Sequence, residues 1–393
     1  GFFMSLGKAA VYKHIPVYYP NNVGSVGGLV GMIGGLGGFV LPIIFGALLD
    51  LTGIYTTCFV FLFLLVAVAM GWMHMAVRSM ERANPGVSRD ALPQLPEFEG
   101  MAIPTAPSAA ILTEWEPENA AFWAKDGKRI AYRNLWISIP ALLLAFSVWM
   151  VWSVVVAKLP AIGFDFNQGQ LFWLAALPGL SGATLRIFYS FMVPVFGGRL
   201  WTTLSTASLL LPAMGIGYAV QNPETPYLIF LVLALLCGLG GGNFASSMAN
   251  ISFFYPKSEK GNALALNAGL GNLGVSVMQF LVPLVITMGV FGVMGGNPQP
   301  LAAGGELWLQ NAGFVWVPFI IAATIAAYLG MNDIASAKSS FADQAVIFSR
   351  FHNWIMCILY TGTFGSFIGY SAGFPLLMRT QFPDVNALQY AFL

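Results

Sequence analysis

Arg186 is a charged residue in the middle of a long apolar stretch. It stands in ALPGLSGATLRIFYSFMVPVF, inside a segment expected to span a membrane over residues 169–195. A central arginine costs at least about 2.5–3.5 kcal/mol on insertion scales, so it indicates a functional site unless the fold accommodates it. Its planar guanidinium can donate two parallel hydrogen bonds, which suits a flat oxyanion.

The acidic residues do not reach the predicted depth of Arg186. Every Asp and Glu falls in a loop, in a polar linker or at the end of a span; outside the linker they are Asp50, Asp165, Glu224, Glu259, Glu306, Asp333, Asp343 and Asp384. We therefore expect Arg186 to bind an anion. In the structural alternative, the side chain snorkels or bonds to backbone carbonyls of a neighbouring helix.

A glycine- and asparagine-rich stretch is the second candidate. Residues 255–283 read YPKSEKGNALALNAGLGNLGVSVMQFLVP, and on a helix turning about 100° per residue Asn267, Gly271 and Gly274 form one stripe. Small residues on a stripe let helices approach closely, which is the packing interpretation. Carboxamides could also donate hydrogen bonds to an anion without adding charge.

Residues on two other spans could complete the site. Asn243 and Asn250 in GGNFASSMANISFFYP lie at depth and must face protein, water or substrate. Tyr360 and Phe364 are four residues apart in ILYTGTFGSFIGYSAGF, so they share a helix face. Such pairs usually pack, but with Phe244 opposite them they could border a flat anion while the Tyr360 hydroxyl donates a bond.

The glycine-rich pattern occurs twice. Residues 19–42 read YPNNVGSVGGLVGMIGGLGGFVLP, and an offset of 236 residues (255 − 19) aligns Gly35 with Gly271 and Gly38 with Gly274. Such an echo is typical of transporters built from two related halves. The glycines expected to pack helices are Gly31, Gly35, Gly38, Gly238, Gly242, Gly271 and Gly274.

The elements that must position these residues are membrane helices. Hydrophobic residues make up 57% of the chain and charged residues 8%, against about 25% charged in soluble domains. Apolar stretches of about 20 residues indicate membrane spans, so we predict an all-α membrane protein. The spans are expected near residues 23–48, 54–77, 135–157, 169–195, 200–220, 227–250, 261–289, 312–331 and 351–378, with parts of further helices at 1–12 and 386–393.

A polar segment over residues 78–134 interrupts the spans. Its first part is rich in proline, and its second part, ENAAFWAKDGKRIAYRN, is expected to form a short interfacial helix leading into a span. Alternating the loops places 14 of the 17 Lys and Arg residues on the side of this linker, with Lys158 and Arg379 opposite. Because positive residues favour the inside, the linker is predicted to be cytoplasmic.

Several function classes lack support in the sequence. A net charge of +1 gives no basis for a nucleic-acid partner. The three cysteines and three histidines do not cluster, so we expect neither a metal nor a cofactor. A nucleophile–base pair and a phosphate loop are also missing from the sequence, so we do not expect an enzyme.

From residue 111 onward the chain resembles the first two-thirds of a NarK-type nitrate/nitrite porter of the major facilitator superfamily. The resemblance lies in AYRNLWISIPALLLAFSVWM, ALPGLSGATLRIFYSFMVPVFGGR, GGNFASSMANISFFYPK and NAGLGNLGVSVMQ. Residues 1–82 resemble the last helices of another such porter, through NVGSVGGLVGMIGGLGGF. The resemblance implies an internal piece of a tandem fusion: 1–82 from a first porter, a linker at 83–134, and at 135–393 the first seven helices and the start of the eighth of a second porter.

The resemblance also implies roles for individual residues. Arg186 would grip nitrate, Phe244 and Phe364 would sandwich it, Tyr360 would donate from its hydroxyl, and Asn272 would be a signature asparagine near the substrate. The family's second arginine falls outside the chain, so the functional partner is expected to be the rest of the same protein. Since the two copies are assigned to different porters, only the second copy is expected to share a site with Arg186. The loop FGGRLW also lacks the superfamily's usual aspartate, so we do not expect the usual gating contacts there.

The predicted function is nitrate–nitrite exchange by alternating access across the bacterial cytoplasmic membrane. Proton relays need a titratable group in the membrane, and the spans after the linker lack Asp, Glu or His at depth. An empty carrier with buried positive charge would resist reorienting, which favours exchange. Proton-coupled nitrate symport is the alternative, and an anion channel or a non-transporting membrane scaffold belongs to a different class.

Overall fold

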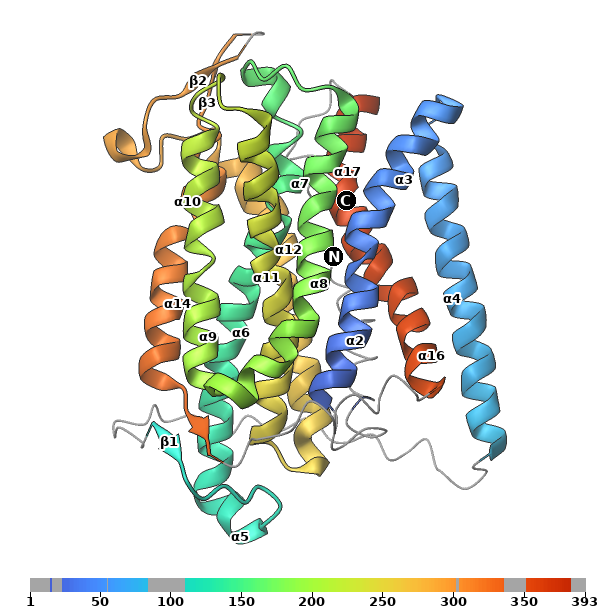
Figure 1. The fold of residues 1–393 in the computed structure, drawn as a ribbon, viewed down its shortest axis with the longest axis vertical. Coiled ribbons are helices and arrows are strands. Elements are labelled where there is room, and N and C mark those ends of the chain that lie inside the picture. Colours follow the sequence, from blue (N-terminus) through green and yellow to red (C-terminus); the bar gives the residue numbers. More distant parts are fainter. Residues whose placement is uncertain are drawn as a thin grey trace.

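Long helices running along a shared direction make up the structure (Figure 1). It is a computed structural model that describes residues 15, 23–54, 56–83, 110–301, 304–335 and 351–382. Its long helices are α2 (Val23–Gly35), α3 (Gly37–Thr52), α4 (Thr56–Ala83), α6 (Lys128–Met150), α8 (Gln168–Phe196), α9 (Gly198–Ala207), α10 (Leu210–Ala219), α11 (Tyr227–Phe254), α12 (Lys257–Val285), α14 (Val317–Gly330), α16 (Phe351–Tyr360) and α17 (Ser366–Gln381).

The membrane spans predicted from apolar stretches are present as helices. Eight helical segments within the described residues are long and apolar enough to cross a membrane. A ninth predicted span corresponds to α4, whose apolar stretch is shorter, Thr56–Trp72. The chain is therefore an all-α membrane protein. The helix tails predicted at 1–12 and 386–393 lie outside the described residues.

The helix expected at the membrane interface is not separate from the span that follows it. The short α5 (Ala120–Phe122), a π-helical turn at Trp123–Gly127 and α6 form one continuous helix, which extends to Val155 through α7 (Trp152–Val155). Asn119 begins this helix because its side-chain oxygen accepts hydrogen bonds from the backbone N–H groups of Ala121 and Phe122. The π-helical turn at Trp123–Gly127 changes the hydrogen-bonding register of the backbone but does not interrupt the helix.

Two small sheets lie at opposite ends of the bundle (Figure 1). At one end β1 (Ile111–Leu112) pairs in parallel with β4 (Asp333–Ile334). At the other end β2 (Gln299–Pro300) pairs antiparallel with β3 (Glu306–Leu307). The first sheet joins the segment before α6 to the segment after α14, so the two ends of this group of helices are held together.

The first glycine-rich copy packs inside the same bundle as the helices after the linker. Helices α2 and α3 lie against α8, and α3 also lies against α17. At Gly37 an added Cβ would lie 2.5 Å from Gly365 Cα, and at Gly38 it would lie 3.4 Å from Gly179 Cα. The backbones are close enough that the first contact requires glycine at position 37 and the second requires glycine at position 179, where an added Cβ would collide with the Gly38 backbone. The assignment of these segments to two different porters stays a prediction.

Candidate functional site

The Arg186 side chain is completely buried between helices. Its relative exposure is 0%. Nε donates to the carbonyl oxygen of Gly241 on α11 at 2.9 Å, and Nη1 donates to the carbonyl oxygen of Gly31 on α2 at 2.5 Å. The structural alternative for Arg186 predicted hydrogen bonds of this kind, to backbone carbonyls of neighbouring helices. The two bonds fix the plane of the guanidinium between α2 and α11.

Three aromatic rings surround the guanidinium. Its carbon atom Cζ lies 4.9 Å from the ring centroid of Phe244 on α11 and 4.9 Å from that of Phe364. The Trp149 ring on α6 lies 5.1 Å away. All three distances lie within the range of cation–π attraction, which compensates part of the cost of burying the charge.

The rings of Phe244 and Phe364 are nearly parallel. Their centroids are 6.4 Å apart and their planes differ by 18°. A triangle with sides of 4.9, 4.9 and 6.4 Å puts Cζ about 3.7 Å from the midpoint between the two rings. The guanidinium therefore flanks the space between the rings and does not lie on the axis that joins them.

Tyr360 and Phe364 share a face, as their spacing predicted. Their rings stack with centroids 4.9 Å apart and an interplanar angle of 26°. The helix is interrupted here by a π-helical turn at Thr361–Gly365, which carries Phe364. Turns of this kind occur often at functional sites because they re-aim side chains. Both side chains are fully buried.

The first glycine-rich copy closes over Arg186, and this corrects the prediction that only the second copy would share its site. Gly31 supplies the carbonyl acceptor. An added Cβ at Gly35 would lie 3.6 Å from Arg186 Cζ and 3.3 Å from the Ala183 Cβ. An added Cβ at Gly34 would collide with the Tyr360 ring. Glycines on α2 are what allow this approach.

The second copy packs mainly on α6. An added Cβ would meet Leu142 at Gly271 and the carbonyl of Leu143 at Gly274, so both glycines serve helix packing. The buried Asn267 donates from Nδ2 to Ser247 Oγ at 2.8 Å.

The remaining signature positions also have structural partners. Asn272 is buried on α12 and donates to the carbonyl of Ala268 one turn earlier, at 2.5 Å. On α11, Gly238 lies against Ser181 and Gly242 lies against Tyr189. Asn243 donates to the Ser205 carbonyl at 3.3 Å and lines a polar cavity.

Trp149 is the residue at this site that the sequence reading missed. Its indole N–H donates to the carbonyl of Pro178 on α8 at 2.5 Å, which holds the ring beside Arg186. Phe146, three residues earlier, packs against both Phe244 and Phe364. The sequence did contain a signal for them: the two aromatic residues in AFSVWM are three apart, which places them on one face of a helix. The Gly31 carbonyl had no such signal, since every residue carries one.

The loop FGGRLW is hydrogen-bonded to a carboxylate from a distant part of the chain. Asp333 Oδ1 accepts the backbone N–H of Arg199 at 2.7 Å, and Oδ2 faces Arg199 Nε at 3.4 Å. Gly197 has φ of +84°, and its missing side chain leaves room for this carboxylate. Asp333, the first residue of β4, thus binds a loop that contains no aspartate of its own.

The alternation of loops predicted that Lys158 and Arg379 lie on the same side of the membrane. In the structure the positive charge of Arg379 acts on Lys158. Burial lowers the pKa of Lys158, and the positive charge of Arg379 lowers it further. Both effects disfavour the charged form.

Comparisons with known proteins show which family the chain belongs to. Residues 1–278 match the Major Facilitator Superfamily. The chain is 59% identical over 285 residues to the nitrate/nitrite transporter NarU of Escherichia coli (strain K12), covering 72% of this chain and 62% of that protein. It is 44% identical over 290 residues to the probable nitrate/nitrite antiporter NarK2 of Thermus thermophilus, covering 72% of this chain and 65% of the relative.

The nitrite extrusion protein of Bacillus subtilis (strain 168) is more distant, at 23% identity over 245 residues, with 62% of this chain and 55% of that protein covered. The chain thus spans less than two thirds of the length of these relatives. The family match covers more than half of this chain, and the helical membrane fold is the one expected of it. The chain belongs to the Major Facilitator Superfamily.

Proposed function

We propose that this protein transports nitrate and nitrite across the membrane, and that the anion binds between Phe244 and Phe364 beside Arg186. The observation that carries the proposal is the position of the Arg186 guanidinium, equally distant from two nearly parallel rings. A flat anion between the rings would have apolar faces above and below it and a guanidinium at its edge.

The distances suit this binding mode. Two parallel hydrogen bonds of about 2.7–2.9 Å from a guanidinium place the central atom of an oxyanion close to 4 Å from Cζ. The midpoint between the Phe244 and Phe364 centroids lies about 3.7 Å from Cζ. The Gly241 and Gly31 carbonyls orient the guanidinium plane and so determine the edge that an anion would meet.

Residues around this position would complete the site. Tyr360 stacks on Phe364, and its hydroxyl would donate a hydrogen bond to the anion. Trp149 would support the guanidinium from α6. Asn272 would act from α12 as the signature asparagine of the family.

Nitrate and nitrite appear in the names of two relatives of this chain, NarU and NarK2. Exchange of the two anions is the mode we favour, as in the antiporter named among them. An arginine buried against rings and carbonyls keeps its charge when the substrate leaves. Reorientation of the empty carrier would therefore move a buried positive charge without the substrate anion beside it, which is costly.

The protein is a multi-pass membrane protein, and we propose that it lies in the bacterial cytoplasmic membrane. The end of the bundle that carries β1, β4 and the α8–α9 turn would face the cytoplasm (Figure 1). The excess of Lys and Arg in the loops at this end supports the orientation.

Transport by the reconstituted full chain tests the proposal. Nitrate uptake into liposomes is measured with nitrite inside, with no anion inside, and with a pH gradient alone. Exchange predicts saturable uptake only when nitrite is inside. Net uptake driven by the pH gradient into nitrite-free vesicles would replace exchange by symport. Uptake that never saturates would indicate a channel, and no uptake in any condition would reject the transport function.

A further inference from the structure

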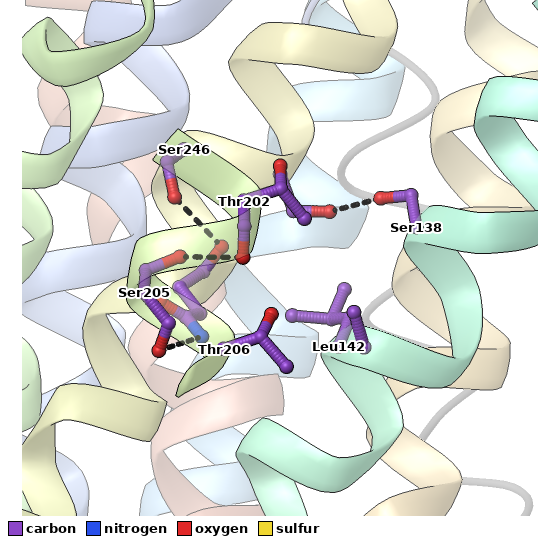
Figure 2. A pocket seen from close by; sticks show the side chains of 9 residues that line it. Ser138, Leu142, Thr202, Ser205, Thr206 and Ser246 are labelled. Atoms are coloured by element: carbon purple, nitrogen blue, oxygen red, sulfur yellow. Dashed lines mark hydrogen bonds between the residues drawn. The ribbon is translucent and has the colours of Figure 1, made fainter. Parts of the chain in front are cut away.

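A small polar cavity lies between α6, α9 and α11, apart from the Arg186 cluster. Each of the three helices contributes three of its nine lining residues (Figure 2). Seven of the nine are Ser, Thr or Asn. Polar side chains are expensive inside a membrane bundle unless they are hydrogen-bonded, so a concentration of them needs an explanation.

Several residues of the lining are hydrogen-bonded to one another, through side chains or through backbone carbonyls. Ser138 Oγ and Ser247 Oγ are 2.8 Å apart and join α6 to α11. Ser246 Oγ donates to the carbonyl of Asn243 at 3.2 Å. Asn243 Nδ2 donates to the Ser205 carbonyl at 3.3 Å, which joins α11 to α9 (Figure 2).

Two fully buried side-chain atoms of the lining have no hydrogen-bond partner among the described residues. They are Asn243 Oδ1 and Thr206 Oγ1. Thr206 is 0% exposed and Asn243 is 5% exposed, so bulk water does not satisfy them. An acceptor and a donor left unsatisfied in one cavity would cost about 1–3 kcal/mol each. A small polar ligand that accepts from one and donates to the other removes both costs.

The volume of the cavity limits the size of the ligand that it can hold. The space open to the centre of a water molecule is about 10 Å³, close to the roughly 10–15 Å³ that one buried water requires. We propose that the cavity holds one bound water molecule, which donates to Asn243 Oδ1 and accepts from Thr206 Oγ1. The water bridges α9 and α11, and Ser246 Oγ offers it a third partner.

This water site is independent of the proposed transport function. The site accounts for two buried polar atoms of the cavity, Asn243 Oδ1 and Thr206 Oγ1, that have no hydrogen-bond partner among the described residues.

A double-variant cycle on the full chain tests the bridge, read as the midpoint of thermal unfolding in detergent. The variants are Thr206→Val, which keeps the side-chain shape, Asn243→Leu, and the two together. Each single variant removes the water and leaves the other partner unsatisfied. The double variant is therefore expected to lower Tm by clearly less than the sum of the single shifts. Shifts that simply add would overturn the proposal.

Thr203→Val is the matched control. Thr203 lies three residues before Thr206 on α9, and its hydroxyl donates to the Arg199 carbonyl at 2.8 Å outside the cavity lining. Its Tm shift should add to that of Asn243→Leu. Thr206→Ser retains the hydroxyl and should lie closer to the parent Tm than Thr206→Val. A high-resolution density map with an empty cavity would refute the water directly.

Discussion

Arg186 and Gly31 are 155 residues apart in the chain and are joined by a hydrogen bond of 2.5 Å from guanidinium Nη1 to the carbonyl oxygen. This bond connects α8 with the first glycine-rich copy. It places a segment from before the linker at the centre of the candidate site. The site is thus composed of residues from both sides of residues 84–109, which lie outside the described structure.

Replacing Arg186 by lysine should abolish tight nitrate binding. An ammonium cannot present the planar fork that a flat anion requires. Losing one charge-assisted hydrogen bond, worth about 1.5–3 kcal/mol, lowers affinity at least about tenfold. Isothermal titration with nitrate measures the change. Arg199→Lys, on the loop bound by Asp333, is the control and should bind normally. An Arg186→Lys protein with parental affinity would leave Arg186 a purely structural role.

Phe364→Leu should weaken nitrate binding because it removes one of the two parallel rings. The ring is fully buried and stacks on Tyr360, so Tm should fall as well. Phe374→Leu separates the two effects, since Phe374 stacks on Tyr370 and belongs to a different cluster. We expect it to change Tm but not nitrate affinity. Equal losses of affinity in both variants would indicate general damage to the fold.

Gly37→Ala should strongly lower Tm. The new Cβ would lie 2.5 Å from the Cα and O atoms of Gly365, and backbone atoms cannot move aside as a flexible side chain can. Gly71→Ala in α4 is the control, because a Cβ there has nothing within 4 Å. An alanine in a helix is favoured over glycine by about 1 kcal/mol, so Gly71→Ala should keep or raise Tm. Similar Tm values for both variants would contradict the close packing of α3 on Gly365.

Asp333→Ala should destabilise the end of the bundle that carries the α8–α9 turn. It removes the acceptor of the Arg199 backbone N–H and the partner of its side chain. Asp333→Asn keeps an acceptor oxygen and should lose less. Thermal unfolding measures both, with Asp126→Asn as a control because Asp126 pairs with Arg129 at 3.7 Å on an exposed surface. Exposed pairs contribute about 0–1 kcal/mol, so the control should shift little.

Lys158→Gln should raise Tm at neutral pH, and the gain should disappear in strong alkali. The folded pKa of Lys158 lies below its ordinary value of 10.5 because of burial and Arg379. Between these two pKa values the unfolded chain binds more protons than the folded one, so stability increases with pH. The penalty is full below the folded pKa and absent above 10.5. Unfolding curves across this pH range measure it. The exposed Lys125→Gln should show no such gain, and a pH-independent gain at position 158 would exclude charge as its cause.

The local features of this protein could be predicted from its sequence. Helix periodicity and apolar length are properties of single segments, so the spans were recognised and Arg186 was placed inside one of them. Tyr360 and Phe364 were expected on one face because four residues make about one helical turn. A short helix was predicted before the span at 135–157, but its continuity with that span was not, because charged residues separate the two apolar patterns.

The sequence by itself therefore determined the helices, the buried arginine and the stacked aromatic pair. Only the tertiary structure decided which glycine-rich copy meets Arg186. Both copies carry stripes of small residues. Such a stripe indicates that another helix can approach closely, but it does not indicate which helix that is. The partner depends on complementary surfaces: Gly31 and Gly35 of α2 fit α8, whereas Gly271 and Gly274 of α12 fit α6. The hydrogen bond from Arg186 to Gly31 depends on that fit, since a backbone carbonyl has no sequence signature.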